Sequence, residues 1–122
     1  MTDRPPRAFE VDDAGPRGAP GVAVHGEIDI GNVQDLEVAL DAAIHKSDGA
    51  FIVDLCDVGF LDSSGLHVLL RARSLLARED RALAVVCRPG PVRRVLELSG
   101  TADLFFIYGS RQEAAAALVR SD

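Results

Sequence analysis

Apolar and polar residues follow one another along this chain in blocks that predict strands and helices in turn. Short apolar runs bounded by turn residues are typical of buried strands, whereas apolar residues three and four positions apart indicate one face of a helix. The expected strands cover residues 9–11, 21–25, 51–55, 83–87 and 104–107. The expected helices follow an N-cap at Asn32, run over 65–77, open at Pro91 and follow a capping box at 110–113.

Strands that alternate with helices from residue 22 onward imply an α/β fold with a mostly parallel central sheet. We expect about five strands, with the N-terminal strand as an antiparallel edge, and about four helices. Residues 1–7 are polar and contain proline, so we expect a flexible N-terminal tail. The remaining residues, 8–120, are expected to form a single domain, because 122 residues suffice for one hydrophobic core.

The stretch 51–70 joins a buried strand to an amphipathic helix through the turn Asp62-Ser63-Ser64-Gly65. Asp62 or one of the serines can cap the helix. Capping accounts for one such side chain. It accounts less well for two serines beside a glycine, which destabilises a helix by about 1 kcal/mol relative to alanine. A glycine at this position is expected to leave the turn open to close approach by another molecule.

A catalytic serine is one interpretation of this turn. His67 follows Ser64 by three residues, His25 lies elsewhere, and three aspartates are available to orient a base: Asp54, Asp57 and Asp62. The turn lacks the G-x-S-x-G pattern of a nucleophile elbow, however, and a base must itself be oriented by a third group. A serine hydrolase that uses Ser64 is therefore kept as an alternative.

Other chemistries have less support in the sequence. The nucleotide-binding patterns G-x-x-x-x-G-K-[ST] and G-x-G-x-x-G are absent, and His25, His45 and His67 show no metal-ligand spacing. The net charge is -6, the arginines are scattered, and there is no tryptophan and one tyrosine, which argues against a nucleic-acid surface. We expect no cofactor, no metal and no direct contact with nucleic acid.

The cellular compartment follows from cysteine usage and hydropathy. Cys56 and Cys87 form no C-x-x-C pair, so we expect free thiols in a reducing compartment. No apolar stretch reaches 18 residues, and the first eight residues lack the hydrophobic region of a signal peptide. We expect a cytoplasmic protein without membrane contact.

Phosphorylation is a further interpretation of the serine turn. A phosphoryl group adds a charge of about -1.5 to -2, and the dipole and free N–H groups of a helix start favour negative charge. No lysine or arginine lies between Lys46 and Arg71, so nothing nearby in the sequence would neutralise a phosphate. The phosphate would stay exposed and repel an acidic or close-packed partner.

Three segments of the chain resemble the signature of STAS domains, specifically the bacterial anti-sigma factor antagonists. Residues 26–29 (GEID) resemble the first-loop G-E-[IL]-D of that family, 62–66 (DSSGL) its phosphorylation loop, and 91–100 (PVRRVLELSG) its short helix before the last strand. The three segments at these separations are specific, whereas D-S-S-G alone is not. His67 departs from the family pattern, in which a glycine is common there, and so does the long turn 12–20.

The resemblance implies a function and assigns residues to it. Ser64 would be phosphorylated by a cognate anti-sigma factor with serine kinase activity, with Asp62 as support and Ser63 as an accessory or alternative site. The unphosphorylated protein would bind the anti-sigma factor and so free a sigma factor. Phosphorylation would release the anti-sigma factor, and a phosphoserine phosphatase would reverse the modification. A STAS domain that regulates a partner other than a sigma factor regulator is the alternative.

The resemblance also implies a partner-binding face with no catalytic residues of its own. Both signature loops are expected at one edge of the sheet, because the carboxyl ends of parallel strands gather there. Asp62 and Gly65 would support the phosphorylation loop. The expected partner contacts are Glu27, Ile28, Asp29, Asp62, Ser63, Ser64, Gly65, Leu66 and His67.

Overall fold

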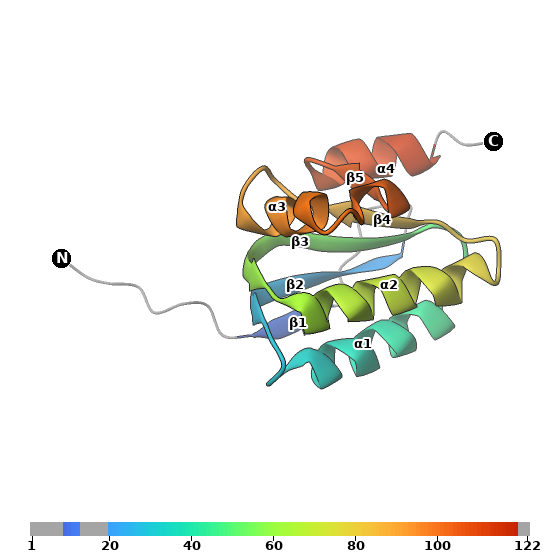
Figure 1. The fold of residues 1–122 in the computed structure, drawn as a ribbon. Coiled ribbons are helices and arrows are strands. Elements are labelled where there is room, and N and C mark those ends of the chain that lie inside the picture. Colours follow the sequence, from blue (N-terminus) through green and yellow to red (C-terminus); the bar gives the residue numbers. More distant parts are fainter. Residues whose placement is uncertain (1–8, 13–19, 120–122) are drawn as a thin grey trace.

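The computed structural model describes residues 9–12 and 20–119, so the expected tail 1–7 and most of the turn 12–20 lie outside the described residues. A five-stranded sheet runs in the order β1-β2-β3-β4-β5 (Figure 1). β1 pairs with β2 in antiparallel fashion, and all the other described pairs are parallel, which confirms the predicted α/β sheet. The strands are β1 (Glu10–Asp12), β2 (Gly21–Ile28), β3 (Phe51–Leu61), β4 (Leu83–Val86) and β5 (Phe106–Tyr108).

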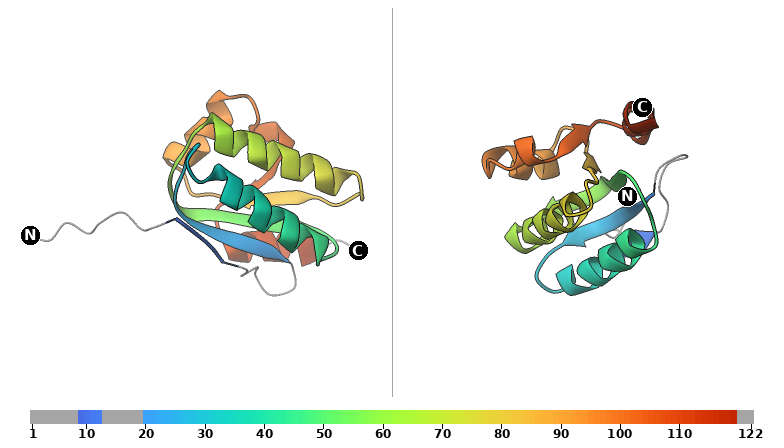
Figure 2. Two further views of the ribbon diagram at one scale, coloured as in Figure 1. Left: turned by 90° about the horizontal axis from the view of Figure 1, so that it is seen from below. Right: turned by 90° about the vertical axis from the view of Figure 1, so that its right-hand side faces the viewer.

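Helices cover both faces of the sheet. In the described ranges there are four α-helices and a short 3-10 helix, η1 (Ala102–Leu104), so the predicted helix number is confirmed. The helices α1, α2 and α3 lie on one face of the sheet and α4 lies on the other (Figure 2). The α-helices are α1 (Val33–His45), α2 (Ser63–Ala77), α3 (Pro91–Leu98) and α4 (Arg111–Val119).

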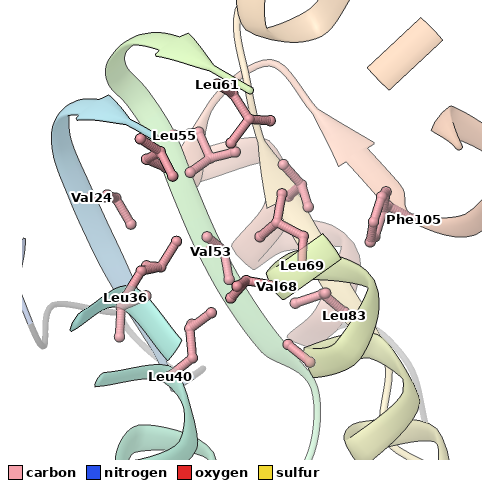
Figure 3. Packing of buried hydrophobic residues seen from close by; sticks show 14 of the residues in the cluster. Val24, Leu36, Leu40, Val53, Leu55, Leu61, Val68, Leu69, Leu83 and Phe105 are labelled. Atoms are coloured by element: carbon pink, nitrogen blue, oxygen red, sulfur yellow. The ribbon is translucent and has the colours of Figure 1, made fainter. Parts of the chain in front are cut away.

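Two hydrophobic clusters hold these layers together, because successive side chains of a strand point to opposite faces of the sheet. Val53 of β3 packs with Leu36 of α1 and Leu69 of α2 in the larger cluster (Figure 3). Ile52, the preceding residue, packs in the smaller cluster with Ala114 of α4. A strand with both faces covered needs apolar residues at consecutive positions, as the sequence 51–53 has.

β3 continues to Leu61, whereas the sequence pattern predicts its end at residue 55. It pairs with β2 as far as Leu61 but with β4 only over Phe51–Asp54. Near its end, at Phe60 and Leu61, β3 lies beside α3. The prediction is wrong because Asp57, past the expected end, interrupts the apolar run without ending the strand. The long strand carries Leu61 past the end of β4, and the serine turn follows at once.

Other boundaries also differ from the sequence-based expectation. β2 continues to Ile28, three residues past its expected end at residue 25. The helix α2 begins at Ser63 instead of Gly65, so both serines belong to its first turn. The apolar run at residues 104–107 is divided between η1 and β5, and β5 begins only at Phe106. Phe105 between them is buried in the larger cluster, which explains why an unbroken apolar run spans two elements.

Candidate functional site

Asp62 holds the start of α2. One carboxylate oxygen, Oδ1, accepts hydrogen bonds from the backbone N–H of Ser64 at 2.9 Å and of Gly65 at 3.2 Å. The same oxygen accepts a hydrogen bond from the Ser64 hydroxyl at 2.5 Å. Asp62 is therefore the N-cap of α2, and the two serines are free of the capping role that one of them could have had.

The hydrogen bond from the Ser64 hydroxyl lowers the pKa of Asp62, and the backbone N–H groups of Gly65, Ser64 and Ile30 add to this effect. Partial desolvation acts in the opposite direction but does not outweigh them. Asp62 is thus ionised at neutral pH. An ionised carboxylate only accepts hydrogen bonds, so the proton of this contact belongs to Ser64. Asp62 orients the hydroxyl without being basic enough to remove its proton.

Two of the N–H groups expected to be free for a phosphate are already occupied. The backbone N–H groups of Ser64 and Gly65 donate to Asp62, so a phosphoryl group on Ser64 would compete with Asp62 for them. Phosphorylation also removes the hydroxyl proton that Ser64 donates to Asp62. The turn would then hold a phosphate beside a carboxylate, and like charges at this distance repel each other.

Gly65 lies against the ends of β2 and β3. A Cβ atom at this position would collide with Cδ1 of Leu61 and lie 2.7 Å from Cγ2 of Ile28. Both of these side chains are buried. The glycine therefore permits close packing inside the protein, and the expectation that it leaves the turn open to another molecule is wrong. It brings the first turn of α2 directly onto the strand ends.

The loop between β2 and α1 lies beside this turn. The backbone N–H of Asp62 donates to the carbonyl of Ile28 at 3.2 Å. Asn32 holds the loop: its Oδ1 accepts from the backbone N–H of Asp29 at 3.1 Å, and its Nδ2 donates to the carbonyl of Glu27 at 2.7 Å. Asn32 occupies the predicted N-cap position of α1, but its side chain makes no cap hydrogen bond. It locks the loop that carries Glu27 and Asp29.

The expected partner contacts divide by solvent exposure. Ile28, Gly65 and Leu66 are buried, and their contact with a partner stays a prediction. The remaining six are exposed or partly exposed: Glu27, Asp29, Asp62, Ser63, Ser64 and His67.

The histidines do not complete a catalytic pair with Ser64. In the part of the chain that the structure describes, no hydrogen bond joins Ser64 to His67. His25 lies between two carboxylates, with Nδ1 2.6 Å from Oδ2 of Asp57 and Nε2 2.8 Å from Oδ2 of Asp12. Both ring nitrogens of His25 are engaged there, a pairing that the sequence pattern did not indicate. The described geometry therefore offers Ser64 no general base.

Both cysteines are free. Burial raises the pKa of the Cys87 thiol. Burial and the neighbouring Asp54 raise the pKa of Cys56 to about 11. Both thiols are therefore protonated at neutral pH and are poor nucleophiles.

Residues 9–12 and 20–119 contain neither a metal-binding cluster nor a membrane-spanning helix. No group of three or more His, Cys, Asp or Glu side chains there is arranged to hold a metal ion. None of the helices in these ranges combines the length and the apolar character needed to cross a bilayer.

A groove next to the serine turn was not anticipated from the sequence. It has a volume of about 340 Å³ and lies between the end of β3 and α3. The one signal in the sequence is Leu98, which falls outside the apolar face of α3 that Val92 and Leu96 form.

Known proteins similar to this chain share its fold and its sequence features. The model of the STAS domain family matches residues 13–114. BtrV of Bordetella bronchiseptica, named as an anti-sigma factor antagonist, is 34% identical over 95 residues, which cover 77% of this chain and 81% of BtrV.

Solved structures agree with these matches. An anti-sigma factor antagonist from Mycobacterium paratuberculosis superimposes with a TM-score of 0.80 at 33% identity, and the match covers 92% of this chain and 93% of that one. The anti-sigma factor antagonist SpoIIAA in its unphosphorylated form has a TM-score of 0.72 at 19% identity, with coverage of 94% and 100%. The second similarity supports the fold alone.

Proposed function

The chain belongs to the STAS domain family, and on that premise we propose that it is an anti-sigma factor antagonist controlled by phosphorylation of Ser64. In this proposal the unphosphorylated protein binds an anti-sigma factor with serine kinase activity and so frees a sigma factor. Phosphorylation of Ser64 dissociates the complex, and a phosphoserine phosphatase restores binding. The protein itself has no catalytic activity.

The observation that carries this proposal is the oriented hydroxyl of Ser64 in the first turn of α2. Ser64 is partly exposed, and its Oγ donates to Asp62 at 2.5 Å, so one direction of the hydroxyl is fixed. A kinase active site can then approach from the solvent side. Transfer joins Oγ to the γ-phosphorus of ATP and releases ADP and one proton.

The same position explains why phosphorylation would act as a switch. Glu27 and Asp29 lie at the end of β2 and just after it, where Ile28 is hydrogen-bonded to Asp62, and Ser63 and His67 belong to α2. All four are exposed or partly exposed polar residues that a partner can cover. In the complex, a phosphate on Ser64 would be a desolvated charge beside the ionised Asp62. An unpaired buried charge destabilises a complex by several kcal/mol, and each 1.4 kcal/mol changes affinity about tenfold. One phosphate therefore suffices to dissociate the partner.

Phosphorylation assays test the site assignment directly. A Ser64→Ala bait, which cannot be released by phosphorylation, would retain the cognate anti-sigma factor from a native lysate for identification and purification. With that purified kinase and ATP, the native chain should gain one phosphate and Ser64→Ala none. Ser63→Ala is the matched control and should still be phosphorylated. Full phosphorylation of Ser64→Ala would contradict the assignment.

Two further results distinguish the proposal from its alternatives. Covalent labelling of Ser64 by a fluorophosphonate probe would support a serine hydrolase and contradict the proposal. The protein retained by the Ser64→Ala bait could instead be a regulator of some other process. In that case the chain is a STAS module for a partner outside sigma-factor control, and the proposed function is wrong.

A further inference from the structure

An apolar groove adjoins the serine turn. Its walls are Phe60 and Leu61 at the end of β3 and Pro91, Val95 and Leu98 of α3. Leu98 is 80% exposed and Phe60 46% exposed, although both side chains are large and apolar. When a partner covers apolar surface of this kind, the free energy of the system falls, so binding is favoured.

The groove and Ser64 share one supporting residue. Leu61 forms part of the groove and also packs beneath Gly65, the residue that follows Ser64. Asp62, which holds the Ser64 hydroxyl, is the next residue after Leu61. The groove and the serine turn are thus built on neighbouring residues at the same end of β3.

The rim of the groove carries a positive charge. Arg94 of α3 lines it and is exposed. In the described part of the chain, Arg93 pairs with Glu97, whereas no carboxylate pairs with Arg94. An apolar floor with an unpaired guanidinium at its edge is complementary to an apolar side chain that has an acidic neighbour.

We propose that this groove is the second half of the docking face and receives an apolar side chain of the anti-sigma factor, flanked by an acidic residue that pairs with Arg94. This inference rests on the proposed function and extends the predicted contacts from the loops at Glu27 and Ser64 to α3. The arrangement also couples the groove to the switch. A phosphate on Ser64 stands at the same edge of the sheet and repels the acidic residue that Arg94 attracts.

The test measures binding of the purified anti-sigma factor, obtained with the Ser64→Ala bait, to variants of the full chain by isothermal titration calorimetry. Leu98→Asp should weaken binding by about tenfold or more, because it places a charge on an apolar contact. Val38→Asp is the matched control, since Val38 is an exposed apolar residue on α1. It should leave the affinity within about twofold of the native value.

Arg94→Glu tests the acidic neighbour and should weaken binding by about tenfold, with a smaller loss at high salt because ion pairs at a rim are screened. Leu98→Ala is a milder variant that keeps the test valid if Leu98→Asp does not fold. It should also weaken binding. If Leu98→Asp, Leu98→Ala and Arg94→Glu all bind the anti-sigma factor with native affinity, the proposal that the groove is a docking site is wrong. If phosphorylation of Ser64 still abolished binding in that case, the proposed function would stand. If phosphorylation of Ser64 also left the affinity unchanged, the proposed function would be wrong as well.

Discussion

A single oxygen of Asp62 combines a structural role and a chemical role. It accepts the N–H groups that begin α2 and the hydroxyl of Ser64. The sequence pattern predicted that Asp62 or a serine would cap the helix, but it could not indicate which one. The choice depends on side-chain geometry, and it leaves Ser64 available for modification.

The titration of Asp62 yields a prediction about stability. Its folded pKa lies below its ordinary value, so the ionised form stabilises the fold above about pH 4 and this contribution is lost as the pH falls through the lowered pKa. Asp62→Asn keeps an N-cap residue but cannot titrate. We expect the stability advantage of the native chain over this variant to be constant from about pH 7 to 5 and to shrink below about pH 4.

Urea denaturation of both proteins across this pH range measures the difference. Asp62→Ala serves as the comparison that removes the cap, and it should lower the free energy of unfolding by about 1 kcal/mol at neutral pH. If the difference in free energy of unfolding between the native chain and Asp62→Asn grew as the pH fell, the assigned contacts of Asp62 would be contradicted.

At the scale of elements, α2 is placed by the contact of Gly65 with the ends of β2 and β3. Gly65→Ala would improve helix propensity by about 1 kcal/mol. The added methyl group would, however, collide with Leu61 and Ile28, whose buried side chains have little room to move. Overpacking of this kind destabilises by about 1–3 kcal/mol. We expect the collision to prevail and the free energy of unfolding to fall by about 1 kcal/mol.

Chemical denaturation checks this prediction. Gly59→Ala is a suitable control, since a Cβ at Gly59 would meet no atom within 4 Å. A Gly65→Ala variant more stable than the native chain would show that helix propensity outweighs the contact and that α2 is less tightly packed on the strands than described.

The order of elements was predictable because hydrophobic periodicity depends on neighbours in the sequence. Their ends were less so. The expected end of β3 at residue 55 failed because Asp57, beyond that end, stays in the sheet opposite His25 of β2, whose Nδ1 lies 2.6 Å from its Oδ2. Asn32 was placed at the start of α1 correctly, but its hydrogen bonds to the preceding loop depend on the folded path of residues 27–31.

At the scale of the whole molecule, parallel topology brings the two signature loops together. The rule that carboxyl ends of parallel strands share an edge predicted this, and the hydrogen bond from Asp62 to Ile28 confirms it. The groove beside α3 and the contacts of His25 were beyond prediction. Each joins side chains more than ten residues apart whose approach depends on strand register and on where the sheet ends.

The most direct test of the account compares the affinity of two forms of the full chain for the purified anti-sigma factor. One form is unmodified, and the other carries phosphoserine at position 64 alone. We expect phosphorylation to weaken binding by at least about tenfold, equivalent to about 1.4 kcal/mol, with Ser64→Ala binding like the unmodified chain. Equal affinity of the phosphorylated and unmodified forms would contradict the claim that Ser64 is the switch.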